Sequence, residues 1–256
     1  MPDWFYRPVA RPLLFRLPHR LARGIALGFL GALARLPGGG RLIDFLGHLR
    51  ADPALSRLVA DTRYPSPLLL SWRIDPEGRA FRAFARFGAG GFVAPASPEV
   101  PDITRSADAL QESSANHITW RGRAADGLPV LRHVRENPFG GEWLLTPDGA
   151  RWPVLPWDQA PVDQPAAGVA LQVGQRAPDG RWTLGLSAPE DLPRRVAEWR
   201  AALGPDRPLV VWGGVAEPAD AVALMRAGAD LLVVEAGLVF SGPGLIKRAN
   251  AAMLAD

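Results

Sequence analysis

The end of the chain alternates between short apolar runs and helical patterns. Leu209–Trp212 and Leu231–Glu235 have the length and apolar character of buried strands, and helical patterns at Pro218–Ala227 and Gly244–Leu254 follow them. A strand, a helix and a further strand form a parallel unit, because the helix returns the chain to the starting edge of the sheet. This alternation predicts an α/β fold.

The same alternation appears earlier in the chain. Leu68–Trp72 and Phe92–Ala94 are expected strands, and Asp75–Phe87 between them is an expected helix with three phenylalanines on one face. From about Pro98 to Gly185 the pattern changes, because Asp–Gly pairs separate short apolar runs, which is typical of β-hairpins. The strands expected there are Ile118–Arg121, Val130–Val134, Glu142–Leu145, Val169–Val173 and Trp182–Leu186. A helix over Pro189–Leu203 is expected to follow them.

Residues 1–63 have the pattern of a separate helical unit. Apolar side chains recur at helical spacing beside a stripe of arginines, until a Pro-Gly-Gly-Gly sequence that starts at Pro37 ends the helix. The apolar positions are Leu17, Leu21, Ile25, Phe29, Leu33 and Leu36, and the basic positions are Arg16, Arg20 and Arg23. A second helix with apolar residues between Leu42 and Leu49 is expected next, so the sequence predicts an N-terminal helical hairpin.

Positive charge is concentrated in this unit. Residues 1–63 hold ten arginines and four aspartates, although the whole chain has a net charge of only +3. A basic, apolar unit on an acidic body favours an anionic surface such as a layer of lipid headgroups over nucleic acid. The uncharged run Gly24–Ala34 is too short to cross a bilayer, which needs about 20 residues. The hairpin therefore either docks on its own body or a protein partner, or lies in the membrane interface.

Several chemistries are unsupported by the sequence. There is no cysteine, and the four histidines do not have the spacing of metal ligands. Glycine-rich nucleotide-binding motifs and the nucleophile motif of serine hydrolases are missing as well. We expect no metal site and no nucleic-acid partner. The nine tryptophans, among them Trp120, Trp143, Trp152, Trp157 and Trp182, suit either a protein interface or a rebuilt core.

Two longer stretches resemble a known family. The first runs from Tyr6 to Leu17 with the sequence Tyr-Arg-Pro-Val-Ala-Arg-Pro-Leu-Leu-Phe-Arg-Leu, and the second runs from Arg207 to Pro243 through Gly213-Gly214 and Glu235-Ala236-Gly237. Both resemble the quinone-linked (class 2), membrane-associated dihydroorotate dehydrogenases, which are FMN-containing (β/α)8 barrels. The resemblance also implies that the N-terminal helix pair meets the bilayer.

The resemblance, together with the length of the chain, leads to a prediction of the fold. A complete (β/α)8 barrel takes about 250 residues, and the 256 residues here also include the N-terminal unit. We therefore predict a shortened, degenerate and partly opened (β/α)8 (TIM-like) barrel over residues 64–256, with β-hairpin insertions. Residues 1–63 are expected to be an amphipathic extension that binds a membrane or a partner.

The family's FMN site is only partly present. Gly213, Gly214 and Gly237 match the cradle of the FMN phosphate, where backbone N–H groups and a helix N-terminus meet an anion. The family has an aromatic and a small hydroxyl residue where this chain has Glu235 and Ala236. A carboxylate beside a phosphate costs about 4 kcal/mol at ~4 Å and an effective dielectric constant near 20. We expect this vestigial cradle to be empty.

The residues that the family uses for chemistry are also changed. Trp72 and Arg73 replace an alanine and a glycine that lie against the flavin, and Pro76 replaces a lysine. Asp75 with Pro76 is expected to cap the following helix. The family's serine base is missing, and Ser113-Ser114-Ala115-Asn116 is similar to its motif only by chance.

We therefore expect a non-catalytic, dihydroorotate-dehydrogenase-like protein without catalytic residues or a cofactor. It is expected to be peripheral on the cytoplasmic face of the inner membrane, as a structural or accessory subunit. Its partners would be the membrane surface and subunits of a quinone-linked respiratory or photosynthetic complex. The alternative is an active, FMN-dependent and quinone-reducing oxidoreductase. A third hypothesis is a small-molecule sensor that uses the vestigial pocket.

Overall fold

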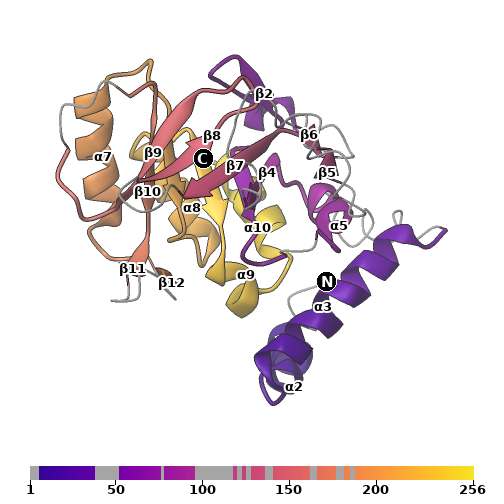
Figure 1. The fold of residues 1–256 in the computed structure, drawn as a ribbon. Coiled ribbons are helices and arrows are strands. Elements are labelled where there is room, and N and C mark those ends of the chain that lie inside the picture. The colour runs from indigo at the N-terminus through magenta and orange to yellow at the C-terminus, as the bar shows by residue number, and fades with distance from the viewer. Residues whose placement is uncertain are drawn as a thin grey trace.

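The computed structural model describes residues 6–37, 52–75, 78–95, 118–119, 123–124, 128–135, 141–161, 166–176, 182–184 and 188–256. Eight strands form a closed barrel at the centre of the protein (Figure 1). In order around the ring they are β3 (Leu68–Ser71), β4 (Gly91–Pro95), β7 (Val130–Arg135), β8 (Glu142–Leu145), β9 (Arg151–Pro156), β10 (Val169–Gln172), β13 (Leu209–Trp212) and β14 (Leu231–Val234). The ring closes where β14 pairs with β3. The α/β barrel is as predicted, but the expectation that it is partly opened is wrong.

The direction of β8 explains how relatively few residues close the ring. Among the described barrel strands, β8 is antiparallel to both neighbours, whereas the other neighbouring pairs are parallel. β7, β8 and β9 therefore form a meander, and antiparallel neighbours do not need the crossover helices that join parallel strands. Gly149 lies in the β8–β9 turn with a φ of +92°, as expected for the Asp148–Gly149 pair.

Some strands differ from the sequence prediction. β9 was not expected, since it contains Pro153 and Pro156, and proline is unusual in the interior of a sheet. Two small antiparallel pairs lie outside the ring. They are β5 (Ile118–Thr119) with β6 (Arg123–Ala124), and β11 (Gly174–Arg176) with β12 (Trp182–Leu184). The Asp–Gly pairs at 126–127 and 179–180 lie outside the described residues.

Helices cover the outside of the ring. They are α5 (Phe81–Arg86), α7 (Leu192–Leu203), α8 (Pro218–Arg226), α9 (Ala236–Ser241) and α10 (Leu245–Leu254). The phenylalanines at 81, 84 and 87 are buried on one face, as expected, but α5 begins six residues later than predicted. The reason is the Asp75 carboxylate, which accepts the N–H groups of Arg79 and Ala80 at 3.0 and 2.7 Å. Asp75 therefore closes the turn before the helix instead of capping the helix.

The core has two parts, one inside the ring and one between the ring and its helices. Leu69, Val93 and Val210 belong to the inner part, and their neighbours Leu70, Phe92 and Val211 belong to the outer part. This is the alternation expected of a strand with a face on each side. Trp152 and Trp212 are fully buried in the inner part. Of the two roles considered for the tryptophans, Trp152 therefore has the one of filling the core.

A short hairpin packs against the inner core. β1 (Arg57–Val59) pairs with β2 (Thr62–Tyr64), and Val59 and Tyr64 join the inner cluster. The predicted domain boundary after residue 63 falls within this hairpin. A short helical turn, η2 (Pro53–Leu55), precedes it and packs against α10. The division into two domains stays a prediction.

The N-terminal segment consists of a π-helical turn, η1 (Tyr6–Ala10), α2 (Arg11–Leu14) and α3 (His19–Arg35). Tyr6 donates its hydroxyl to the Val239 carbonyl oxygen at 2.6 Å, so η1 is joined to α9. α3 runs beside α5 (Figure 1) and buries Leu27 and Leu30 in the outer core. A Cβ on Gly31 would lie 2.3 Å from the Arg79 carbonyl oxygen, so glycine permits this close approach. The expected second helix lies outside the described residues.

Candidate functional site at the barrel mouth

The carboxyl ends of the parallel strands place polar side chains inside the barrel mouth. Ser71 lies two residues beyond Leu69, and Trp212 lies two residues beyond Val210, on the inner face of their strands. The same spacing applies on β7, β10 and β14. We use the term mouth cluster for Ser71, Arg73, His133, Glu142, Gln172, Trp212 and Glu235.

Glu235 is the hub of the mouth cluster. Its side chain is 2% exposed, and its Oε1 accepts the Ser71 hydroxyl and the Trp212 Nε1–H, each at 2.6 Å. Arg73 Nη1 lies 3.5 Å from the same oxygen as the opposite charge. A buried carboxylate costs several kcal/mol unless it has such partners. Three partners from β3, β13 and the turn after β3 therefore fix Glu235 in the mouth.

Flat side chains fill the space around this hub. The Arg73 guanidinium carbon lies 4.9 Å from the centre of the Trp212 ring, a distance typical of a cation–π contact. His133 meets Trp212 edge-on at 4.9 Å between ring centres, and the Trp72 ring is stacked with His133 at 6.5 Å between ring centres. This stack occupies the mouth with the chain's own side chains.

His133 and Gln172 complete the cluster. His133 Nε2 lies 3.3 Å from Glu142 Oε2, and both residues are at least nine-tenths buried. Gln172 is fully buried, and neither its amide nitrogen nor its amide oxygen has a hydrogen-bond partner. An unpaired buried amide is costly, so this position has capacity for a water molecule or a small polar ligand.

The predicted phosphate cradle has a different explanation in the structure. Gly213 and Gly214 have φ values of +94° and +76°, which favour glycine, and the Gly213 N–H donates to the Val233 carbonyl oxygen at 2.8 Å. A Cβ on Gly237 would lie 2.0 Å from the Val215 carbonyl oxygen. Local backbone geometry therefore requires these three glycines.

At the N-terminus of α8, beside the cradle, a carboxylate of the chain itself already accepts backbone N–H groups. The Asp220 carboxylate accepts the N–H groups of Ala216 and Glu217 at 2.9 and 2.8 Å, ahead of α8. The Glu217 carboxylate itself accepts the Ser241 hydroxyl at 3.0 Å. Backbone donors that could meet a phosphate are thus used by a side chain of the same turn.

The N-terminal helices carry an apolar surface. Leu17, Leu21, Ile25 and Phe29 are 37–52% exposed, and we name them, together with Leu13, Phe15 and Leu36, the apolar stripe. Arg16 and Arg23 are exposed, and the structure does not describe the Arg20 side chain, so the membrane-facing role of these arginines stays a prediction. Leu33 differs from the prediction, because it is half-buried against the outer core. Among the described helices, none is both long and apolar enough to cross a membrane.

Part of the sequence is similar to known enzymes of one kind. A stretch of 58 residues is 48% identical to a dihydroorotate dehydrogenase (quinone) from Albidiferax ferrireducens. A match of the same length to the protein of that name from Acidovorax sp. is 43% identical. Each match covers 23% of this chain and 16% of the relative. No family model matches the chain.

The fold agrees with this similarity. A solved DHODH from Eimeria tenella, in complex with ferulenol, has a TM-score of 0.50 to this chain at 12% sequence identity. That alignment covers 95% of this chain and 94% of the solved one. Over the matched stretch the chain is therefore similar to quinone-linked dihydroorotate dehydrogenases, and its barrel has the fold of a solved protein of that kind.

The relationship to dihydroorotate dehydrogenases implies FMN, and the residues present do not fit it. The ring would need the space that Trp212 and Arg73 occupy above the inner core, and Glu235 would face it. In the cradle, the Gly213 N–H is already bonded to the Val233 carbonyl oxygen, and the Asp220 carboxylate places a negative charge at the start of α8 beside it. The described residues also include no group of three or more acidic or histidine side chains that could hold a metal.

The sequence indicated some of this site and missed the rest. Trp72, Arg73 and Glu235 were expected to exclude the flavin, and all three lie at the mouth. Trp212 and Gln172 were missed, although the alternation along their strands places both on the inner face. The string Ser113–Asn116 lies outside the described residues.

Proposed function

We propose that the protein is a non-catalytic relative of dihydroorotate dehydrogenase that serves as a structural or accessory subunit at a membrane. It would associate peripherally, on the cytoplasmic face of the inner membrane. Its partners would be subunits of a quinone-linked respiratory or photosynthetic complex. The observation that carries the proposal is the Trp212–Glu235–Arg73 contact, because it fills the barrel mouth with bonded side chains.

The chemistry of the mouth supports a non-catalytic role. Proton abstraction needs a base with access to a substrate. His133 is 9% exposed, contacts two indole rings and lies 3.3 Å from Glu142. Glu235 is held by three partners, so removing it from them for catalysis would carry the cost of an unpaired buried group.

The apolar stripe supports membrane association. A fully buried leucine, isoleucine or phenylalanine contributes about 1.5–3 kcal/mol relative to an exposed one. Leu21, Ile25 and Phe29 are each about half exposed, and they lie at four-residue intervals on one face of α3. Burial of this face in the headgroup region would recover part of that energy, and Arg16 and Arg23 would meet anionic lipids.

The test of the catalytic part is the flavin content and activity of the purified protein. We expect a colourless protein that does not take up added FMN and does not reduce a quinone with dihydroorotate. The alternative, an active FMN oxidoreductase, predicts a yellow protein with dihydroorotate-dependent quinone reduction, and that result would overturn the proposal. For the accessory role, we expect subunits of a membrane complex to co-purify with the protein from native membranes.

A second candidate, a small-molecule sensor, is favoured by the unpaired amide of Gln172. A ligand with both a hydrogen-bond donor and an acceptor would satisfy the two ends of that amide. Binding would raise the melting temperature, and the rise would grow with the logarithm of ligand concentration above the Kd. A screen of flavins, nucleotides and orotate in which no compound raises the melting temperature would count against the sensor.

A further inference from the structure

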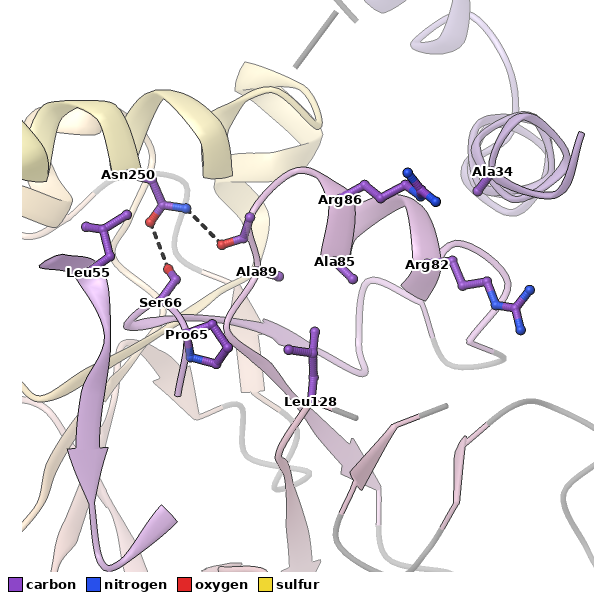
Figure 2. Close-up of a pocket in the computed structure, with 11 residues that line it drawn as sticks. Ala34, Leu55, Pro65, Ser66, Arg82, Ala85, Arg86, Ala89, Leu128 and Asn250 are labelled. Carbon is purple, nitrogen blue, oxygen red and sulfur yellow. Dashed lines mark hydrogen bonds between the residues drawn. The ribbon is translucent and has the colours of Figure 1, made fainter. Parts of the chain in front are cut away.

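A cavity of about 430 Å³ lies outside the barrel, between α3, α5 and the turn that leads into β3 (Figure 2). Ala34 on α3, Leu55 on η2 and Asn250 on α10 all contribute to its wall. The cavity is separate from the mouth cluster, because Ser66 and Gly88 in its wall precede β3 and β4 at the other end of the barrel. Its volume is in the range of small-ligand sites.

The polar groups in the wall nearest the barrel are hydrogen-bonded to one another. Ser66 donates its hydroxyl to Asn250 Oδ1, and Asn250 Nδ2 donates to the Gly88 carbonyl oxygen, both at 2.8 Å (Figure 2). Pro65 and Leu128 supply apolar surface beside this network. A charged ligand would therefore be bound by the residues at the rim of the cavity, where its charged side chains lie.

The rim is basic. Arg82 and Arg86 lie four residues apart on α5, so they share one face of the helix, and both are exposed. In Figure 2 the Arg86 side chain extends from α5 toward Ala34 on α3. Both arginines also have contacts within the chain. A guanidinium group has five N–H donors in a planar fork that matches a phosphate, and both side chains are exposed, so a phosphate can reach them from solvent.

The cavity lies on the body side of the helix that bears the apolar stripe. Leu27 and Leu30 dock α3 onto the body, whereas Ile25 and Phe29 are exposed away from it. An interfacial helix buries its apolar face by about 5–10 Å, and a helix is about 10 Å wide. The phosphate layer then lies level with the body side of α3, where Arg82 and Arg86 stand.

We propose that this cavity binds the phosphate group of an anionic membrane lipid, with Arg82 and Arg86 as the donors. The proposal rests on the membrane association proposed above and adds a headgroup site to it. Free inorganic phosphate shares this chemistry with a lipid headgroup, and the competition in the experiment below distinguishes the two sources.

The experiment is flotation of the full chain with phosphatidylcholine vesicles, with and without phosphatidylglycerol. We expect phosphatidylglycerol to strengthen binding of the wild type, and the double variant Arg82→Ala/Arg86→Ala to lose most of that gain. Each arginine at an anionic surface contributes about fivefold, so the loss should be roughly tenfold or more. Equal binding of the double variant and the wild type would overturn the site, as would full competition by inorganic phosphate at constant ionic strength.

The matched control is Arg194→Ala/Arg226→Ala. These arginines are 60% and 69% exposed on α7 and α8, and their removal changes the net charge by the same amount. They lie outside the rim of the cavity. Because charges beyond about 10 Å are largely screened, we expect less than about a twofold effect. A loss equal to that of the cavity variant would show that only net charge matters, and would overturn the proposal.

A separate assay distinguishes failure of the site from failure of membrane association. If the wild type binds no vesicle of either composition, the membrane association itself is wrong. Dihexanoyl phosphatidylglycerol, kept below its micelle concentration, then tests the cavity alone. We expect it to raise the melting temperature of the wild type but not of Arg82→Ala/Arg86→Ala, and no rise for the wild type would overturn the cavity site.

Discussion

The Trp212 indole donates its N–H to the Glu235 carboxylate at 2.6 Å inside the barrel mouth, and the Ser71 hydroxyl donates to the same oxygen. The two bonds join β13, β14 and β3, which are neighbours in the ring. Arg73 supplies the opposite charge. The mouth is therefore built around a carboxylate that is part of the fold.

Glu235→Ala should strongly destabilise the protein. Removing one partner of a buried ion pair costs about 3–5 kcal/mol, because Arg73 and the Trp212 N–H would remain buried without their partner. Glu235→Gln should cost less, since its amide oxygen still accepts a hydrogen bond. Urea unfolding measures the loss. Glu198→Ala, which removes a partly exposed carboxylate that pairs with two arginines on α7, is the control, with an expected change within about 1 kcal/mol.

Two glycines of α3 should respond in opposite ways to alanine. A Cβ at Gly31 would lie 2.3 Å from the Arg79 carbonyl oxygen, whereas a Cβ at Gly28 would meet nothing within 4 Å. We expect Gly31→Ala to cost about 1–3 kcal/mol through overpacking. Gly28→Ala should stabilise by up to about 1 kcal/mol through helix propensity. If unfolding experiments found the two variants equally stable, the docking of α3 on α5 would be wrong.

Acidic substitutions in the apolar stripe should weaken membrane binding without unfolding the protein. Ile25 and Phe29 are 49% and 50% exposed, so Ile25→Glu/Phe29→Glu removes apolar contact and adds repulsion by anionic lipid. We expect flotation with phosphatidylglycerol-containing vesicles to fall about tenfold or more. Leu58→Glu is the control, because Leu58 is 72% exposed on β1 and lies outside the stripe. An equal loss for this control would contradict the assignment.

High pH should unfold the protein through Tyr64. Burial raises the pKa of the Tyr64 hydroxyl well above its usual value of 10, and the charge of Asp148 adds to the rise. Because the folded pKa is raised, this contribution to stability is complete below pH ~10 and is lost as the pH rises toward the folded pKa. The chain has two tyrosines, and burial also raises the pKa of Tyr6. We therefore expect tyrosinate absorbance to appear only together with unfolding, and Tyr64→Phe to weaken the pH dependence. Absorbance that rises near pH 10 in the folded state would contradict this.

The sequence predicted the elements whose patterns are local. The strands expected at 68–72, 209–212 and 231–235 are apolar runs, and they form with ends that agree within one residue. The helix α7 has a helical apolar period and begins three residues later than predicted. The closure of the ring depends on β8 and β9, which come together through pairing across the whole barrel. Pro153 and Pro156 also hide β9 from a propensity argument.

The candidate site was predictable only in part. Substitutions within a motif identified Trp72, Arg73 and Glu235, because a family pattern shows where each stands. Trp212 lies in a strand whose pattern is explained by burial alone, so its bond to Glu235 could be found only once the strands were arranged in space. The same holds for Gln172, whose unpaired amide depends on every neighbour.

The reversed direction of β8 has a consequence for the evolution of such rings. A strand that runs in the reverse direction still forms hydrogen bonds with both neighbours, so the barrel stays closed. The two connections to such a strand do not need crossover helices. Chain length alone is thus a poor guide to whether a barrel is whole. A barrel closed in this way keeps its rigid geometry even though side chains of the same chain fill its mouth.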